Sequence, residues 1–189
     1  RQAAHGNNDE MLLTLNFALR QVALITIPAS VGLLILREEI VSVLFQYGEF
    51  TAESTSMTAA ALAGYSVGLI AFAGIRIVAP GFYAMRDTRT PVKIAAVAMV
   101  VNVLGCLGLI PWFGHAGIAV ANSLAAYLNL GVLLVLLRGR VGSFGGGSLL
   151  ASYARLAAAS AVMGWVVWGL RSSLMGDTGA AVITRVLAL

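Results

Sequence analysis

Five apolar runs, each as long as a membrane-spanning helix, dominate this sequence. They occupy residues 15–36, 57–84, 94–112, 116–137 and 149–170. A helix needs about 20 apolar residues to cross the hydrocarbon core of a bilayer, whereas a barrel strand needs about 10 residues and alternates in polarity. Backbone groups in lipid must be paired internally. We therefore predict an all-α fold, a polytopic transmembrane helix bundle.

The composition excludes an ordinary soluble domain. Of the 189 residues, 59% are hydrophobic and only 11% are charged, whereas soluble domains are about 25% charged. A single cysteine, Cys106, excludes an internal disulfide and makes a thiolate metal cluster implausible. The chain begins at Arg1, ends inside a further apolar run that starts near Ala180, and carries no secretion signal. We expect a piece of a longer protein.

The charges of the links predict an orientation. The link between the second and third runs is basic, and so is the link that follows the fourth run, with Arg138 and Arg140. The link over 37–56 is net acidic, and the turn 113–115 carries only His115 as a titratable residue. By the positive-inside rule, the two basic links and the N-terminal end are cytoplasmic. This explains the net charge of +4 without nucleic acid, for which no module pattern is present.

Local patterns indicate how the links are built. Residues 37–56 are the longest link, and their segment IVSVLF either finishes the first helix or lies along the interface. Pro80 is expected to disturb the last turns of the second helix. Pro91 is expected in the first turn of the third helix, where proline is tolerated. Residues 138–148 are basic and then glycine-rich, which is typical of a flexible linker.

Arg76 is the most informative candidate for a substrate path. It lies eight residues before the cytoplasmic end of the second run, which is about 12 Å deep at 1.5 Å per residue. Such an arginine costs about 2.5–3.5 kcal/mol at a helix centre. Either its side chain snorkels to the headgroups or it faces a wet cavity and attracts an anionic substrate. Tyr65, on the same run, is a further path candidate.

Four other cations have two readings each. Arg20 is either an interfacial anchor of the first helix or a cation near the inner mouth of a cavity. The residues of the inner turn either set the topology or meet phosphate headgroups of a lipid substrate; they are Arg86, Arg89 and Lys93.

Asparagines within the runs predict contacts between helices. Asn102, Asn122 and Asn129 are of the kind that hydrogen-bond across helices, and Asn102 and Asn122 are alternatively candidates for a small-cation site. No carboxylate lies in the runs that carry these two residues, so a complete cation site made there is not expected. Gly64 and Gly68 form a GxxxG pattern, typical of close helix packing.

Motifs of enzymes are absent from the sequence. It contains no phosphate-binding loop, no HExxH zinc motif and no paired intramembrane carboxylates, and its two histidines lie in different links. We predict no catalytic residue, no metal and no cofactor, and so no enzyme.

Several phrases of the sequence resemble one family together. PASVGLLIL (28–36) is followed by LFQYGEFT (44–51), then by VAPGFYAMRDTRTPVKIA (78–95) and HAGIAVANSLAAYLN (115–129). They resemble the MurJ/MviN family, the lipid II flippases of bacterial peptidoglycan synthesis, and the likeness covers roughly residues 1–171.

The resemblance implies a place in a larger fold. Family members have fourteen transmembrane helices in two six-helix lobes plus two extra helices. Residues 15–138 resemble helices nine to twelve of the C-lobe, after a cytoplasmic link over 1–14. A flexible cytoplasmic linker follows over 139–148. Residues 149–189 then resemble helix thirteen and the truncated start of helix fourteen.

The resemblance also implies a function. The family moves lipid II, an undecaprenyl-pyrophosphate-linked peptidoglycan precursor, across the bacterial inner membrane by alternating access, and helices thirteen and fourteen form a groove for the lipid tail. Arg76 matches a basic family position. Some members bind sodium through an acidic residue one turn after the position of Asn102, where this chain has Cys106.

The implied partners are lipid II, membrane lipids, the N-lobe of the same chain and the peptidoglycan synthesis machinery. Two other functions stay open: a polysaccharide-lipid or multidrug exporter of the same superfamily, and a non-transporting membrane scaffold for cell-wall enzymes.

Overall fold

The computed structural model describes residues 2–142 and 146–175, with side chains described over 10–142 and 151–172. Within these residues the chain forms six helices and no strand. They are α1 (Gln2–Ile35), α2 (Arg37–Phe45), α3 (Ala52–Ala84), α4 (Arg89–Phe113), α5 (His115–Val141) and α6 (Gly146–Met175). Five of them, all except α2, are long and apolar enough to cross a membrane. The predicted all-α transmembrane fold is confirmed.

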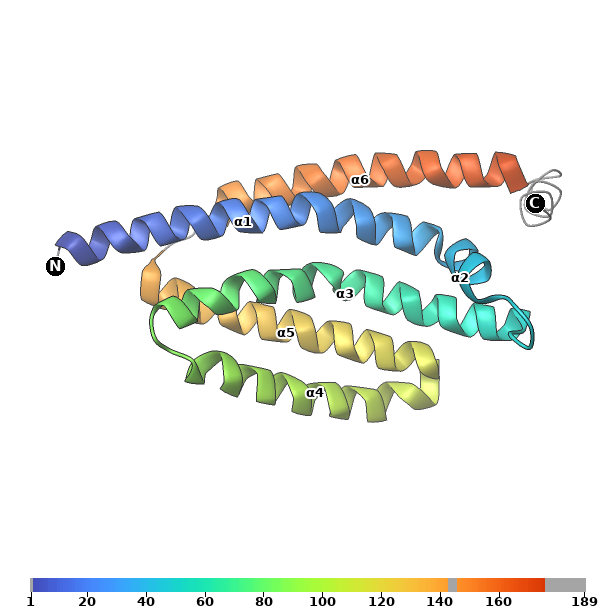
Figure 1. The fold of residues 1–189 in the computed structure, drawn as a ribbon, viewed down its shortest axis with the longest axis horizontal. Coiled ribbons are helices and arrows are strands. Elements are labelled where there is room, and N and C mark those ends of the chain that lie inside the picture. Colours follow the sequence, from blue (N-terminus) through green and yellow to red (C-terminus); the bar gives the residue numbers. More distant parts are fainter. Residues whose placement is uncertain (1, 143–145, 176–189) are drawn as a thin grey trace.

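The five long helices lie side by side in the order α4, α5, α3, α1, α6 (Figure 1). α3 packs most extensively against α5, and α6 packs against α1. Helices α1, α4 and α6 run in one direction and α3 and α5 in the other (Figure 1). As a result, the α3–α4 turn and the C-terminal end of α5 lie at one end of the bundle along the helix axes. The helix α2 and the α4–α5 turn lie at the opposite end (Figure 1). The basic links therefore share one end, as their charges predicted.

Several helices extend beyond the apolar runs. α1 is helical from Gln2, so most of the link expected over 1–14 continues the helix. The segment IVSVLF belongs to a separate helix, α2, because the chain bends at Leu36 between α1 and α2. Of the flexible linker predicted over 139–148, residues 139–141 belong to α5 and residues 146–148 to α6, so these six are helical. Residues 143–145 and the run near Ala180 lie outside the described residues.

Small side chains allow α3 and α5 to approach closely. A Cβ added at Gly64 would lie 2.7 Å from the Cβ of Ala119, and one added at Gly68 would lie 2.3 Å from Oγ of Ser123. Ser123 Oγ donates a hydrogen bond of 2.6 Å to the Gly64 carbonyl. The Tyr127 hydroxyl donates one of 2.8 Å to the Val67 carbonyl. The predicted glycine packing is confirmed, and in lipid such van der Waals contact and hydrogen bonding hold helices together.

A cluster of buried hydrophobic side chains lies toward the end of the bundle that carries the basic links. Phe82 and Leu137 belong to it and are fully buried. Its other buried members are Leu15, Leu19, Val78, Ile94, Leu133 and Val141. The cluster therefore joins α1, α3, α4 and α5 next to the α3–α4 turn.

Prolines are accommodated without ending the helices. α3 continues through Pro80 to Ala84, as neighbouring helices allow in a bundle of this kind. Pro91 lies in the first turn of α4, as predicted.

Candidate functional site: a cationic helix face and an apolar cavity

Arg76 lies on a face of α3 that other described helices leave open. Tyr65, Arg76 and Tyr83 are spaced by eleven and seven residues, which places them on one face at 3.6 residues per turn. All three side chains are exposed, Tyr65 by 43% and Tyr83 by 50%. At 1.5 Å per residue, Tyr65 and Tyr83 lie about 16 Å and 10 Å from Arg76 along the helix, so this face carries one guanidinium with a phenol ring further along on each side. Such a face suits an anionic, partly polar ligand more than it suits hydrocarbon.

A cavity of about 430 Å³ lies elsewhere in the bundle, bounded by α1, α3, α5 and α6. Its walls are mostly apolar, and its polar lining side chains include Arg138 from α5 and Tyr153 from α6. The Tyr153 hydroxyl donates a hydrogen bond of 3.3 Å to the Leu19 carbonyl. Arg76 does not line this cavity. The apolar cavity and the cationic face are therefore distinct features, and the cavity resembles a hydrocarbon-binding site with a cation at one wall.

The turn between α3 and α4 is organised by Asp87. Its Oδ1 accepts hydrogen bonds from the backbone N–H of Arg89 (3.1 Å) and of Thr90 (3.0 Å), which caps the start of α4. Its Oδ2 accepts from the Thr90 hydroxyl at 2.5 Å and pairs with Arg140 of α5. The Arg140 guanidinium also lies 5.4 Å from the centre of the Phe82 ring.

These contacts explain the ionisation of Asp87. The hydrogen bonds from the Thr90 hydroxyl and backbone amide, followed by the Arg140 guanidinium, hold the pKa of the Asp87 carboxyl well below its usual range. The carboxylate therefore stays charged and neutralises Arg140 at neutral pH. The predicted substrate-path residues Arg86, Arg89 and Lys93 are exposed around this turn. Arg86 has a φ of 57°, which helps the chain to reverse between the two helices.

Arg20 lies on α1. Its side chain is exposed on α1, next in sequence to the buried Leu19. It does not line the apolar cavity. Its interfacial and cavity-mouth readings both stay predictions.

Asn102 and Asn122 meet across the α4–α5 interface. Asn102 Nδ2 donates to Asn122 Oδ1 at 3.3 Å, and Cys106 Sγ lies 3.9 Å from Asn102 Oδ1. The pair thus forms a contact between helices, as expected for asparagines in a bundle. No group of three or more His, Cys, Asp or Glu side chains able to hold a metal is found among the residues described. The cation-site reading of Asn102 and Asn122 stays a prediction.

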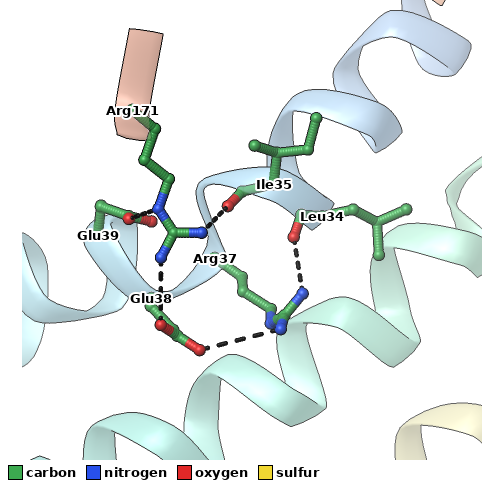
Figure 2. Close-up of polar contacts among 6 residues, drawn as sticks. All are labelled: Leu34, Ile35, Arg37, Glu38, Glu39 and Arg171. Atoms are coloured by element: carbon green, nitrogen blue, oxygen red, sulfur yellow. Dashed lines mark hydrogen bonds and ion pairs between the residues drawn. The ribbon is translucent and has the colours of Figure 1, made fainter. Parts of the chain in front are cut away.

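Two polar clusters were not anticipated from the sequence. One is the pairing of Arg140 with Asp87, and the other joins Arg171 of α6 to Glu38 and Glu39 of α2 (Figure 2). The sequence offers one signal for the second cluster. The acidic link 37–56 follows the first apolar run, and the basic residue Arg171 follows the fifth. Both clusters join segments more than 50 residues apart in the chain.

A model of the family described as lipid II flippase MurJ matches residues 1–187. The chain belongs to the MurJ family. Among curated MurJ proteins, the chain is 34% identical to the probable lipid II flippase of Rhizobium tropici, over 100% of this chain and 37% of that protein. It is 37% identical to the probable lipid II flippase of Vibrio cholerae, over 70% of this chain and 25% of that one. A lipid II flippase of Burkholderia cenocepacia is 38% identical over 72% of this chain and 27% of its own length.

The chain therefore spans about a quarter to just over a third of these MurJ relatives. Its fold is similar to a solved MurJ in the inward closed conformation, with a TM-score of 0.76 and 23% identity. That match covers 87% of this chain and 34% of the solved one. MurJ is a family of transporters, and the five spanning helices agree with a multi-pass protein of the bacterial inner membrane.

Proposed function

We propose that this chain is the C-terminal part of a lipid II flippase, moving the undecaprenyl-pyrophosphate-linked precursor from the inner to the outer leaflet. The observation that carries the proposal is the family match over nearly the whole chain. The mechanism is physical: two lobes rock about a polar headgroup while the polyprenyl tail stays in lipid. This part contributes one wall of the path and no catalytic residue.

Arg76 has the role of attracting the diphosphate. It stands on an open face of α3, about 12 Å from the end of that helix. At that depth the low-dielectric surroundings strengthen its attraction for a phosphate. Tyr65 and Tyr83 on the same face offer hydroxyl donors to the sugar and phosphate oxygens.

The basic inner turn is the entry side. Arg86, Arg89 and Lys93 are exposed around the Asp87 turn and face the cytoplasmic headgroup layer in the predicted orientation. Their charges raise the local concentration of an anionic lipid before it enters the path. The apolar cavity near Arg138 offers a place for a stretch of the polyprenyl tail.

The test is complementation of a strain depleted of its lipid II flippase. The full-length parent is expressed with Arg76→Ala, and with Arg76→Lys as the matched variant that keeps the charge. We expect Arg76→Ala to fail at equal membrane abundance and Arg76→Lys to support growth at least partly. Unchanged growth with Arg76→Ala removes Arg76 from the mechanism. If the unaltered parent does not rescue growth, lipid II flipping itself is rejected, and rescue of another surface polymer then identifies a polysaccharide-lipid exporter.

A further inference from the structure

Helix α6 lies at the edge of the row and rests on α1. Among the described residues, α1 is the helix against which its backbone packs (Figure 1). Most of its described side chains are exposed, including Trp165 and Trp168. A helix with so narrow an interface needs specific contacts to fix its position, because lipid on one side of it is as apolar as the protein on the other.

In the inner and middle parts of the α1–α6 interface, the described contacts include a hydrogen bond from Tyr153 and close packing of small residues. Tyr153 donates to the Leu19 carbonyl near the inner end. In the middle, Ser160 is 2% exposed, and a Cβ added at Gly164 would lie 2.7 Å from Val31 Cγ1 and 2.8 Å from Ile35 Cδ1. This packing fits the two helices closely through uncharged side chains.

The outer end of α6 is held by Arg171 in three directions. Its Nη1 donates to the Ile35 carbonyl at 3.4 Å, its Nη2 donates to Glu38 Oε2 at 3.3 Å, and its Nε pairs with Glu39 Oε1 (Figure 2). One planar guanidinium thus contacts the last residue of α1 and two carboxylates in the first turn of α2. The contacts with Ile35 and Glu38 are hydrogen bonds, the contact with Glu39 is an ion pair, and the planar guanidinium fork makes all three at once.

The site of this contact is the bend between α1 and α2. The C-terminal carbonyls of a helix lack helical partners and carry partial negative charge, so they favour a cation. The Leu34 carbonyl accepts from Arg37 at 3.0 Å, and the Ile35 carbonyl accepts from Arg171. Arg37 also lies 3.9 Å from Glu38, but it contacts only the bend itself and not α6. Two arginines therefore share the cluster, and only one of them connects it to α6.

The bend is in turn anchored to the rest of the bundle. α2 packs against α3, and Val41 of α2 is 2% exposed. Glu39, which faces Arg171, has both carboxylate oxygens shielded from solvent and is 20% exposed as a side chain. A contact with Glu38 and Glu39 thus links α6 to α3 through α2, although α6 does not pack on α3.

We propose that Arg171 is a clasp that fixes the outer end of α6 to the α1–α2 bend, so that α6, α1 and α2 move as one body. The two carboxylates and the Ile35 carbonyl form the fixed half of the clasp, and the guanidinium is the releasable half. Without it, the outer half of α6 loses its ionic contact with the α1–α2 bend and swings in the membrane, while the inner half stays on α1 through Tyr153 and the Ser160–Gly164 packing.

The test measures distances between spin labels in the full-length parent, in a background without other cysteines. The outer pair replaces Leu44 on α2 and Trp168 on α6, both exposed. The inner pair replaces Phe17 on α1 and Ala154 on α6, also exposed. We expect Arg171→Gln to broaden the outer distance distribution about twofold, as local release of a helix end does, and to leave the inner one unchanged.

Matched variants separate a clasp from a general loss of charge. Arg37→Gln removes the other guanidinium of the same cluster and is expected to leave both distributions unchanged. Arg171→Lys keeps the charge without the fork and is expected to give an intermediate width. The double variant Glu38→Gln with Glu39→Gln approaches from the other side and is expected to reproduce Arg171→Gln, which also covers the case in which Arg171→Gln does not accumulate.

An outer distribution that stays narrow in Arg171→Gln or in the double glutamine variant overturns the proposal. Equal broadening by Arg37→Gln also overturns it, because the cluster would then act on the bend and not on α6. Broadening of the inner pair together with the outer pair contradicts it as well, since a clasp at one end does not loosen the other.

Discussion

Arg140, at the end of α5, forms an ion pair with Asp87, in the turn between α3 and α4. Its second guanidinium nitrogen donates to the Thr90 hydroxyl of α4 at 3.2 Å, and its carbon lies over the Phe82 ring of α3. One arginine therefore ties three helices together at the end that carries the basic links. Asp87, the one acidic residue among the basic residues of this turn, therefore organises the turn.

The Asp87 turn predicts a stability that depends on pH. The pKa of Asp87 is lower in the folded state than its ordinary value of 3.8. Asp87 therefore stabilises the fold fully when the pH is above 3.8, and this contribution is lost progressively as the pH falls below 3.8. We expect Asp87→Asn to lower the apparent melting temperature in detergent at pH 7. The difference from the unaltered protein should shrink as the pH is lowered from 5 to 3. Glu49→Gln, at an exposed carboxylate of the other end, should show no such difference; a constant gap for Asp87→Asn would contradict the account.

The close contact of α3 and α5 predicts a penalty for added volume. In Gly68→Ala the new methyl group meets Ser123 Oγ at 2.3 Å, and overpacking of this kind costs about 1–3 kcal/mol. Gly108→Ala is the control, because its methyl group meets nothing within 4 Å and alanine is the better helix former by about 1 kcal/mol. Reversible unfolding in mixed micelles measures both. Equal stabilities of the two variants would show that the contact is looser than described.

The hydrogen bond between Asn102 and Asn122 predicts energetic coupling. A double-mutant cycle with Asn102→Ala and Asn122→Ala should give a coupling of about 0.6 kcal/mol, the average for polar contacts between membrane helices, and no more than about 1.7 kcal/mol. The cycle is measured by unfolding in mixed micelles at fixed salt. Pairing Asn102→Ala with Ser56→Ala, at an exposed residue of α3, provides the uncoupled reference. A coupling near zero for the asparagine pair means that the bond contributes nothing to the packing of α4 on α5.

If the apolar cavity holds part of the lipid tail, as proposed, filling it should block transport. Val22 lines the cavity, so Val22→Trp should reduce growth in the complementation assay without lowering membrane abundance. Ile25→Trp adds the same ring on the same helix at a side chain that is 70% exposed and does not line the cavity. It should support normal growth. If the two tryptophan variants behave alike, the cavity is not part of the path.

The membrane-spanning helices follow from the sequence because length and hydropathy decide them locally. The same holds for Gly64 and Gly68, whose small size predicts contact wherever the partner lies. The pairs Asp87–Arg140 and Glu38–Arg171 do not follow, because each depends on which helices become neighbours in the row. The order of the helices is set by how their side chains pack across the whole bundle. It cannot be read from the local sequence of the two segments that an ion pair joins. The sequence also does not predict α2 as a separate helix. The bend at Leu36 that separates it from α1 depends on the backbone conformation of one residue, which hydropathy does not reveal.

The proposed path requires the end of the bundle with the basic links to face the cytoplasm. Cysteine labelling in intact cells tests this orientation directly. Single cysteines replace Arg89 and Gly139 at one end and His115 at the other, in a full-length parent whose other cysteines are removed. All three positions are exposed, and Gly139 has no atom within 4 Å of an added Cβ. A membrane-impermeant maleimide should label position 115 and leave positions 89 and 139 unlabelled until the membrane is permeabilised. Labelling of positions 89 and 139 from outside, with position 115 protected, would contradict the orientation and the entry of an anionic lipid at the basic turn.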